Sequence, residues 1–275
     1  SEDRPLGLAF RNLFPFLFQK SGYGYFHLGT PKDLERYDEG VVRAFWKRQK
    51  AKPWVMAVCG RFDRDKIMDL ARNLAKEGAK KPSFTFQKPE WSKERVLDLT
   101  LSERNQAHLL VVFSVSGSRH EDAPGLDLLR TVLAGQGGIL FRDLRDKQGL
   151  GYTVTAFLWR TPKTGFLAFY IGTYPDKVDE ALAGFENTVL ALREDLLSKE
   201  ELARAKNLIR GEYHRDHQSL SSRSLEAAGL VVRGFELNHN VANLDKAAKL
   251  SPKDLRTLAR KYLNWDDIRV LRVLP

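Results

Sequence analysis

The order of apolar patterns along residues 95–275 constrains the fold of this chain more than any other feature. Four segments have the pattern of strands: 95–102, 107–115, 152–159 and 166–173. The last two flank the short turn 160–165 and therefore predict a hairpin. Helical patterns follow, and an apolar strand at 268–273 closes the chain. This order is typical of an α+β fold and not of βαβ alternation. We expect a two-layer sandwich with a mixed, mostly antiparallel sheet and helices packed on one face.

The helices expected in this region carry start signals. They are predicted at 122–134, 138–147, 178–192, from Ser198 onward, at about 221–233, and from Ser251 onward. Ser198 and Glu201 form a capping box, because each side chain can bond the backbone N–H of the other. Ser251 is expected to be an N-cap, with Pro252 at the first helical position, where its missing N–H costs nothing.

A weak internal repeat suggests that the fold is duplicated. At an offset of 213 residues, segment 37–60 lies over segment 250–273, and each has an amphipathic helix, a basic turn and an apolar strand. Any helix–turn–strand unit would match similarly, so both interpretations remain open. With a true repeat, residues 1–75 are the C-terminal part of a preceding domain, and residues 95–275 are a complete second domain. Residues 76–94 are rich in Lys, Pro and Ser, which predicts a linker.

The charge pattern argues against a nucleic-acid-binding protein. The net charge is +10 at pH 7, but the basic residues alternate with acidic residues along the predicted helices. Such alternation is typical of a solvated surface. No zinc-finger spacing, ribonucleoprotein motif or basic region followed by heptads occurs in the sequence. A basic nucleic-acid binder is the weakest of the functions considered.

The single cysteine and the absence of long apolar runs exclude an intramolecular disulfide, a cysteine-based zinc site and a membrane-spanning helix. Cys59 alone can form neither an intramolecular disulfide nor a cysteine-based zinc site. It lies in the apolar run 54–60, which predicts a strand with a buried structural thiol. No run of 18 apolar residues could span a membrane. Residues 1–10 lack the features of a signal peptide and resemble a cut end. We expect a soluble protein whose N-terminal targeting region is not present in this chain, so its compartment, cytoplasm or periplasm, stays open.

Two further motifs suggest sites but favour structural interpretations. The glycine-rich loop 134–141 lacks the Gly-Lys-Ser/Thr ending of a phosphate-binding loop and the spacing of a dinucleotide site. A close approach of backbone segments is the better explanation for its glycines. His214 and His217 lie near one helical face, but two ligands do not make a zinc site, and neither HExxH nor HxxEH occurs. A polar helix face is the favoured interpretation.

Arg145 and Tyr152 are the candidate catalytic residues. Between them lies a turn with glycines at Gly149 and Gly151. A guanidinium and a phenol both donate hydrogen bonds. Together they could hold a peptide carbonyl, or the oxyanion that develops when it is attacked, although neither can generate the nucleophile. Taken alone, these residues favour the alternative in which Arg145 caps its own helix and Tyr152 simply begins a strand.

Residues 126–157 resemble the hallmark of the second domain of the pitrilysin/insulinase (inverzincin) family of zinc metallopeptidases. The shared pattern is a glycine-rich turn, then Leu-Phe, Leu-Arg, Lys, Gly-Leu and Tyr. Segment 22–63 resembles the end of a preceding domain of that family, which builds each domain on one duplicated fold. The resemblance implies that Arg145 and Tyr152 contact the substrate at a zinc centre supplied by another domain. It also implies a substrate loop containing these glycines: Gly137, Gly138, Gly149 and Gly151.

The sequence departs from the family pattern in ways that shape the expected function. The zinc-binding HxxEH helix does not occur, Ser21-Gly22 replaces His-Pro, and Gly138-Ile139 replaces Ser-Arg. The resemblance therefore implies the substrate-binding C-terminal part of a zinc metalloendopeptidase that is inactive alone. Zinc and the general base would come from a missing N-terminal half or from a partner subunit, in a homo- or heterodimer. The alternative is a non-catalytic structural or peptide-presenting subunit.

Overall fold

Contacts divide the chain into two compact units. The computed structural model describes residues 5–18, 21–25, 29–75, 89–101 and 105–275. The first of the two units, here called the sheet unit, consists of Ser1–His27, Phe86–Arg210 and Asn243–Pro275. The second unit consists of Leu28–Thr85 and Gly211–Ala242. This division follows packing and does not test the domain boundaries predicted from the internal repeat, which stay a prediction.

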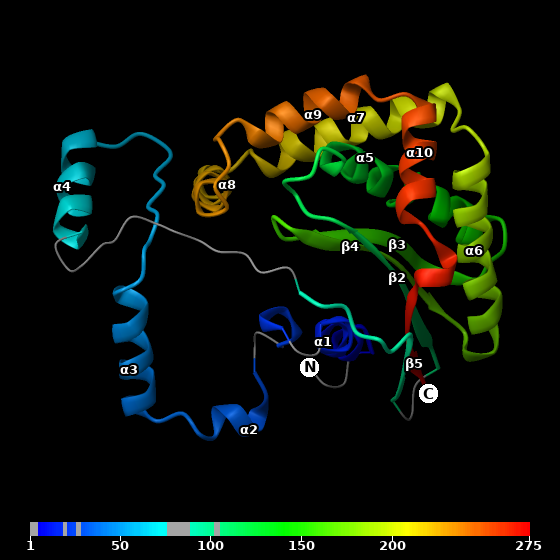
Figure 1. The fold of residues 1–275 in the computed structure, drawn as a ribbon, viewed down its shortest axis with the longest axis horizontal. Coiled ribbons are helices and arrows are strands. Elements are labelled where there is room, and N and C mark those ends of the chain that lie inside the picture. Colours follow the sequence, from blue (N-terminus) through cyan, green and yellow to red (C-terminus); the bar gives the residue numbers. More distant parts are fainter. Residues whose placement is uncertain (1–4, 19–20, 26–28, 76–88, 102–104) are drawn as a thin grey trace. The chain divides into compact units, whose positions relative to one another are not determined.

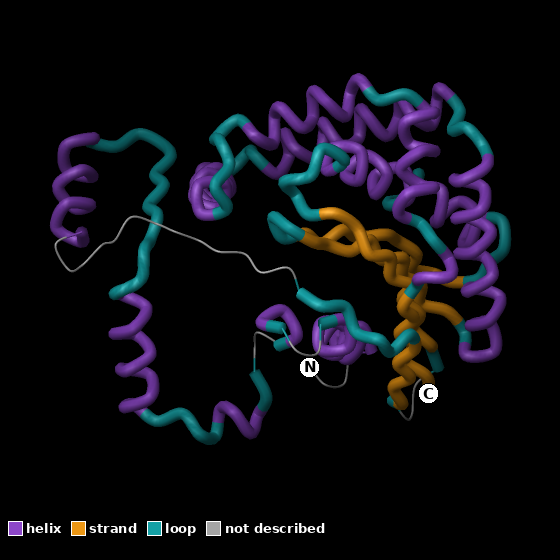
Figure 2. Tube along the Cα trace, in the orientation of Figure 1, coloured by secondary structure: helices purple, strands orange, loops and turns teal. Residues whose placement is uncertain are grey.

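The sheet unit contains one five-stranded sheet in the order β1-β5-β2-β4-β3. The strands are β1 (Val96–Thr100), β2 (Ala107–Ser116), β3 (Gly151–Arg160), β4 (Thr164–Thr173) and β5 (Arg269–Leu274). Only the β1–β5 pair is parallel, and the other three pairs are antiparallel. The strands twist across the sheet (Figure 2). The predicted α+β class with a mixed, mostly antiparallel sheet is confirmed.

One face of the sheet is covered by three helices, α5 (Ala123–Leu133), α6 (Val178–Glu194) and α10 (Pro252–Tyr262), which lie together on one side of the strands in Figure 1. Alternate side chains of β2, Leu109, Val111 and Phe113, are buried in this core. The predicted cap of α10 is confirmed, because Ser251 and Asp254 form a capping box with Pro252 in the first turn.

The opposite face of the sheet is covered by α1 (Pro5–Leu17), which the sequence analysis did not anticipate. Its Leu13 and Leu17 are fully buried against the other set of β2 side chains, Leu110 and Val112. This helix has neither a charged face nor an acidic first turn, and it contains Pro15, so its usual sequence signals are missing. Helices therefore cover both faces of the sheet, with α5, α6 and α10 on one face and α1 on the other.

The described end of the predicted linker packs against the sheet unit. Residues 76–88 lie outside the described part of the chain. The Trp91 ring centroid lies 5.0 Å from the guanidinium carbon of Arg269, and a guanidinium N–H of Arg269 donates to the Ser92 carbonyl at 3.1 Å. The Ser92 amide donates to the Leu17 carbonyl at 2.9 Å. These bonds join α1, the segment before β1, and β5.

The remaining helices are α2 (Pro31–Leu34), α3 (Glu39–Lys50), α4 (Arg64–Ala75), α7 (Lys199–Asp216), α8 (Leu220–Val232) and α9 (His239–Lys249). Short 3-10 turns occur at Gly22–Gly24, Pro175–Lys177 and Trp265–Asp267. The capping box predicted for α7 is confirmed by reciprocal Ser198–Glu201 bonds of 3.1 Å. Among the described residues, no helix is long and apolar enough to cross a membrane.

The predicted strand at 54–60, with its buried thiol, is wrong. No described strand pairs with residues 53–59, and Cys59 is half-buried. The exposed fraction alternates along this segment, with Trp54 and Met56 both at 36%. An extended apolar segment becomes a strand only when a neighbour accepts its backbone hydrogen bonds. The described part of the chain supplies no such neighbour. The exposed fraction therefore alternates along this segment as in a strand, but its backbone forms no strand pairing.

Candidate active site

The candidate site is built on a π-helical turn, η2 (Phe141–Asp146), where the sequence predicted an α-helix over 138–147. The Lys147 amide donates to the Arg142 carbonyl, five residues back, at 3.0 Å. A wider turn of this kind occurs mostly as a single turn within an α-helix, frequently at functional sites. It changes the direction of the side chains that follow it, so Arg145 does not lie where a regular α-helix would place it.

Leu144 anchors this turn in the core. Leu144 is fully buried and packs against Gly184 of α6. A Cβ atom built on Gly184 would lie only 3.2 Å from Leu144 Cγ. The Leu150 amide then donates to the Leu144 carbonyl at 2.8 Å. The buried residue therefore fixes the backbone on which its neighbour Arg145 is carried.

Tyr152 lies in a β-bulge at the start of edge strand β3. Gly151 pairs with Thr173 and Thr153 pairs with Gly172, so Tyr152 has no partner of its own in the ladder. Bulges redirect side chains and are over-represented near active sites. The Tyr152 side chain is 76% exposed, which leaves its phenol accessible.

The structure brings Arg145 and Tyr152 together. The guanidinium carbon of Arg145 lies 4.7 Å from the Tyr152 ring centroid and 4.3 Å from that of Phe141. Arg145 is half-buried, and its guanidinium makes no hydrogen bond or ion pair with any residue that the structure describes. The alternative in which Arg145 caps its own helix is therefore not observed. A partly buried arginine with unused N–H donors is uncommon, because buried charges are usually paired.

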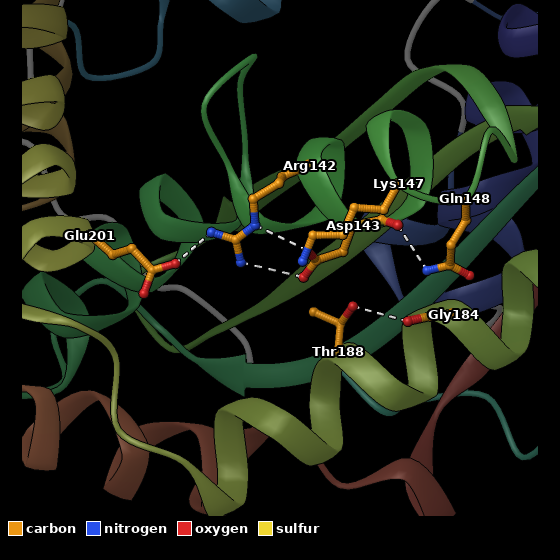
Figure 3. A network of polar contacts seen from close by, with 7 residues as sticks. All are labelled: Arg142, Asp143, Lys147, Gln148, Gly184, Thr188 and Glu201. Atoms are coloured by element: carbon orange, nitrogen blue, oxygen red, sulfur yellow. Dashed lines mark hydrogen bonds and ion pairs between the residues drawn. The ribbon is translucent and has the colours of Figure 1, made fainter.

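Two nearby acids, Asp143 and Glu201, are paired with other cations. Arg142 lies 3.0 Å from Asp143 and 2.6 Å from Glu201, and Lys147 lies 2.9 Å from Asp143. Figure 3 shows Arg142 between the two carboxylates, with Gln148 bonded to the Asp143 backbone. Burial raises the pKa of Asp143, but hydrogen bonds from Arg142 and Lys147 outweigh it and bring that pKa below its usual value. The Arg142 hydrogen bond likewise lowers the pKa of Glu201.

Three of the four glycines predicted for a substrate loop, Gly138, Gly149 and Gly151, have structural reasons in this fold, whereas a Cβ on Gly137 would meet only the end of the flexible Arg204 side chain. A Cβ on Gly138 would lie 2.3 Å from the Ala134 carbonyl oxygen, which confirms the predicted close backbone approach. A Cβ on Gly151 would lie 2.3 Å from the Gly172 carbonyl oxygen, and one on Gly137 would lie 2.3 Å from a guanidinium nitrogen. Gly149 has a φ of 63°, a region that favours glycine. Their part in substrate binding stays a prediction.

The described residues do not offer a metal centre. No group of three or more His, Cys, Asp or Glu residues lies together within the described part of the chain. Two histidines have partners that the sequence did not reveal. His217 bonds the Tyr213 carbonyl and the Glu226 carboxylate, and His108 is buried with its Nδ1 2.8 Å from the Tyr170 hydroxyl. These contacts depend on tertiary placement, which the spacing of histidines does not report.

Comparisons with known proteins agree with this fold. YmxG of Bacillus subtilis, described as an uncharacterized zinc protease, is 25% identical over 224 residues, which cover 81% of this chain and 54% of that protein. The peptidase M16 inactive domain from Pseudomonas fluorescens aligns with a TM-score of 0.82 at 17% identity, over 100% of this chain and 66% of that chain. A chain of complex III2 from Candida albicans aligns with a TM-score of 0.77 at 16% identity, over 99% and 67%.

The chain thus spans about half the length of the zinc protease that it matches. The family described as the peptidase M16 inactive domain matches residues 41–209, which is more than half of the chain. This match includes η2, the bulge at Tyr152 and the whole of strands β1 to β4. It confirms the zinc-peptidase resemblance carried by residues 126–157. The chain belongs to the peptidase M16 family and contains its inactive domain.

Proposed function

We propose that this chain is the substrate-binding C-terminal part of a zinc-dependent metalloendopeptidase. In this proposal, Arg145 and Tyr152 position the peptide and stabilise the tetrahedral intermediate. The observation that carries it is the guanidinium of Arg145, which is half-buried, lies 4.7 Å from the Tyr152 ring and has no acceptor among the described residues. An arginine held in this way has its hydrogen bonds free for a ligand.

The chemistry assigned to this pair is hydrogen-bond donation. The cation–π contact uses the charge of the guanidinium and none of its N–H groups, so these can bond a carbonyl oxygen of a bound peptide. The Tyr152 hydroxyl offers a second donor. When the carbonyl is attacked, its oxygen gains negative charge, and both donors bind it more strongly than they bind the neutral carbonyl. That difference lowers the barrier of the reaction.

This chain's described residues do not fit a zinc site, so we assign no step through a metal to them. Zinc and the base that activates water would be held by an N-terminal half or by a partner subunit. The description of YmxG as a zinc protease supports this, because the aligned region covers only 54% of that relative.

The second unit has an apolar surface that such a partner would cover. On α3, Val42, Phe45 and Trp46 are 51–61% exposed. The same helix lines a cavity of about 290 Å³ together with Tyr37. Apolar side chains gathered in this way are typical of an interaction surface. We propose that the zinc-binding part packs on it.

The test uses the assembled enzyme, formed by this chain with its zinc-binding part. Arg145→Ala and Tyr152→Phe should each lower kcat about 100-fold with a smaller change in KM, because the lost donors act mainly in the transition state. Arg72→Ala and Tyr174→Phe, two exposed residues of the same types, are the controls. Unchanged activity in both Arg145→Ala and Tyr152→Phe would show that the pair is structural.

The alternative is a non-catalytic subunit that supports or presents peptides. It is favoured by the description of the matched family as an inactive domain and by the structural likeness to a chain of complex III2. The two functions differ in one observation. An HxxEH motif in an adjoining part of the same protein, or in a partner that copurifies with it, supports the enzyme, and its absence from both supports the subunit.

A further inference from the structure

Phe141 lies closer to the guanidinium of Arg145 than Tyr152 does. The distances from the guanidinium carbon to the two ring centroids are 4.3 Å and 4.7 Å. Both are within the range in which an aromatic ring attracts a cation. Phe141 is half-buried, so water weakens this attraction less than it would at a fully exposed site.

The π-helical turn places the two side chains together. Phe141 and Arg145 are the first and fifth residues of η2, and a turn closed by bonds between residues five apart brings them to the same side. Between them, Leu144 is fully buried against α6 and holds the backbone. The ring and the cation are therefore carried on one anchored turn, while Tyr152 is contributed by a separate strand.

The kind of partner that Arg145 has determines whether its guanidinium N–H donors remain available to a ligand. A carboxylate partner would accept the N–H groups of the guanidinium and neutralise it. An aromatic ring attracts the cation and leaves those donors unused. Two acids in the network of Figure 3, Asp143 of η2 and Glu201 of α7, are bound by Arg142 and Lys147.

We propose that Phe141 is a positioning residue of this site. Its ring holds the guanidinium of Arg145 beside Tyr152, with the N–H groups directed to a peptide carbonyl. The functional part of this inference rests on the proposed function, whereas the positioning of Arg145 is a property of the chain alone.

The first test measures the contact on which this positioning depends, without any reaction. In the 15N-labelled 275-residue chain, the Nε–H proton of Arg145 should resonate upfield because of the ring current of Phe141, and Arg145→Lys assigns the signal. Phe141→Leu keeps an apolar side chain but removes the ring, so the signal should move downfield. Phe141→Tyr keeps the ring and should preserve its position. Phe235→Leu, at another Arg–Phe contact, where Arg233 lies 5.6 Å away, is the control and should not shift it.

The second test uses the assembled enzyme. Phe141→Leu should lower kcat about fivefold, the size expected for losing one cation–π contact, with a smaller change in KM. Phe141→Tyr should restore the rate. In an Arg145→Ala background, Phe141→Leu should have no further effect, because the ring acts only through the arginine.

The outcomes separate the two proposals. An unmoved Arg145 signal in folded Phe141→Leu, checked by its near-UV circular dichroism, overturns the positioning role. A rate loss from Phe141→Leu that persists in the Arg145→Ala background overturns it as well. If Arg145→Ala leaves the rate unchanged while the signal still moves in Phe141→Leu, the proposed function fails and the contact of the Phe141 ring with Arg145 stands.

Discussion

Arg142 Nη1 lies 2.6 Å from Glu201 Oε1, and this ion pair ties the π-helical turn η2 to the first turn of α7. The other carboxylate oxygen of Glu201 accepts from the Ser198 amide at 3.1 Å. One carboxylate therefore both caps α7 and holds the turn that carries Arg145. Because the two tasks share one side chain, a change at Glu201 affects the helix start and the site together.

Replacing Glu201 by Gln should lower the free energy of unfolding by about 1 kcal/mol at pH 7, since Gln can still cap the helix but cannot form a partly screened ion pair. The pKa of Glu201 is lowered by Arg142, so its contribution is present above the ordinary value of 4.5 and is lost as the pH falls through the folded pKa. Urea unfolding of both proteins at pH 7 and in steps below pH 4.5 measures this. Glu200→Gln is the matched control, and an equal difference at every pH would contradict the prediction.

A larger side chain at Gly184 should displace Leu144 and lower the free energy of unfolding. Gly184→Val places methyl groups where Leu144 now packs, and overpacking of this kind costs about 1–3 kcal/mol. Gly211 lies within α7 with no atom near its missing side chain, so Gly211→Ala should raise stability by about 0.5–1 kcal/mol. Thermal unfolding followed by circular dichroism compares the two. A Gly184→Val protein as stable as the parent would show that Leu144 has room to move.

His217 should make the stability of the chain depend on pH. Burial lowers the pKa of His217, but the Tyr213 carbonyl and the Glu226 carboxylate raise it, and the result is a pKa above its usual value of 6.5. Its stabilising contribution is therefore complete below pH 6.5 and is lost as the pH rises through the folded pKa. Urea unfolding should show that His217→Gln destabilises more at pH 5.5 than at pH 8.5. This pH dependence should become smaller in a Glu226→Gln background, where the Tyr213 carbonyl still raises the pKa of His217; a dependence of unchanged size there would assign the effect to another group.

The isolated chain should bind no stoichiometric zinc and should hydrolyse no peptide. The described residues bring together no group of three metal-binding side chains, and the candidate pair supplies hydrogen bonds without a nucleophile. Metal analysis after dialysis and a mixed-peptide cleavage assay measure both properties. One zinc per chain together with peptidase activity would refute the assignment of metal and base to another part.

The sequence predicted the elements of the sheet because each strand pairs with strands inside the described chain. It failed at 54–60, where the apolar alternation is present but no described strand accepts the hydrogen bonds. It also missed α1 and α9. The apolar α1 lacks a charged face and contains Pro15, and the first turn of α9 contains no acidic residue. Local patterns identify an element only when it carries its own start signals or period.

The candidate site was predicted in part. The residues Arg145 and Tyr152 were named from sequence, but neither the π-helical turn nor the β-bulge that brings them within 4.7 Å was foreseen. Both irregularities insert one residue into a regular repeat, and composition does not show where an insertion falls. The contact of Phe141 with Arg145 was also missed. Residues four apart on a helix are ordinary neighbours, and such a pair is usually only a surface contact.

The position of β5 has a consequence for how the protein forms during synthesis. β5 lies between β1 and β2, and among the described strands it alone pairs with β1, where Val96 lies beside Val270. While the ribosome makes the segment between these two residues, β1 has no partner in the sheet. Pairing across so long a separation is slow, because a large loop must close before the contact forms. An interruption of translation before residue 269 would therefore leave a nascent chain with two open strand edges, which makes it a substrate for chaperones or for aggregation.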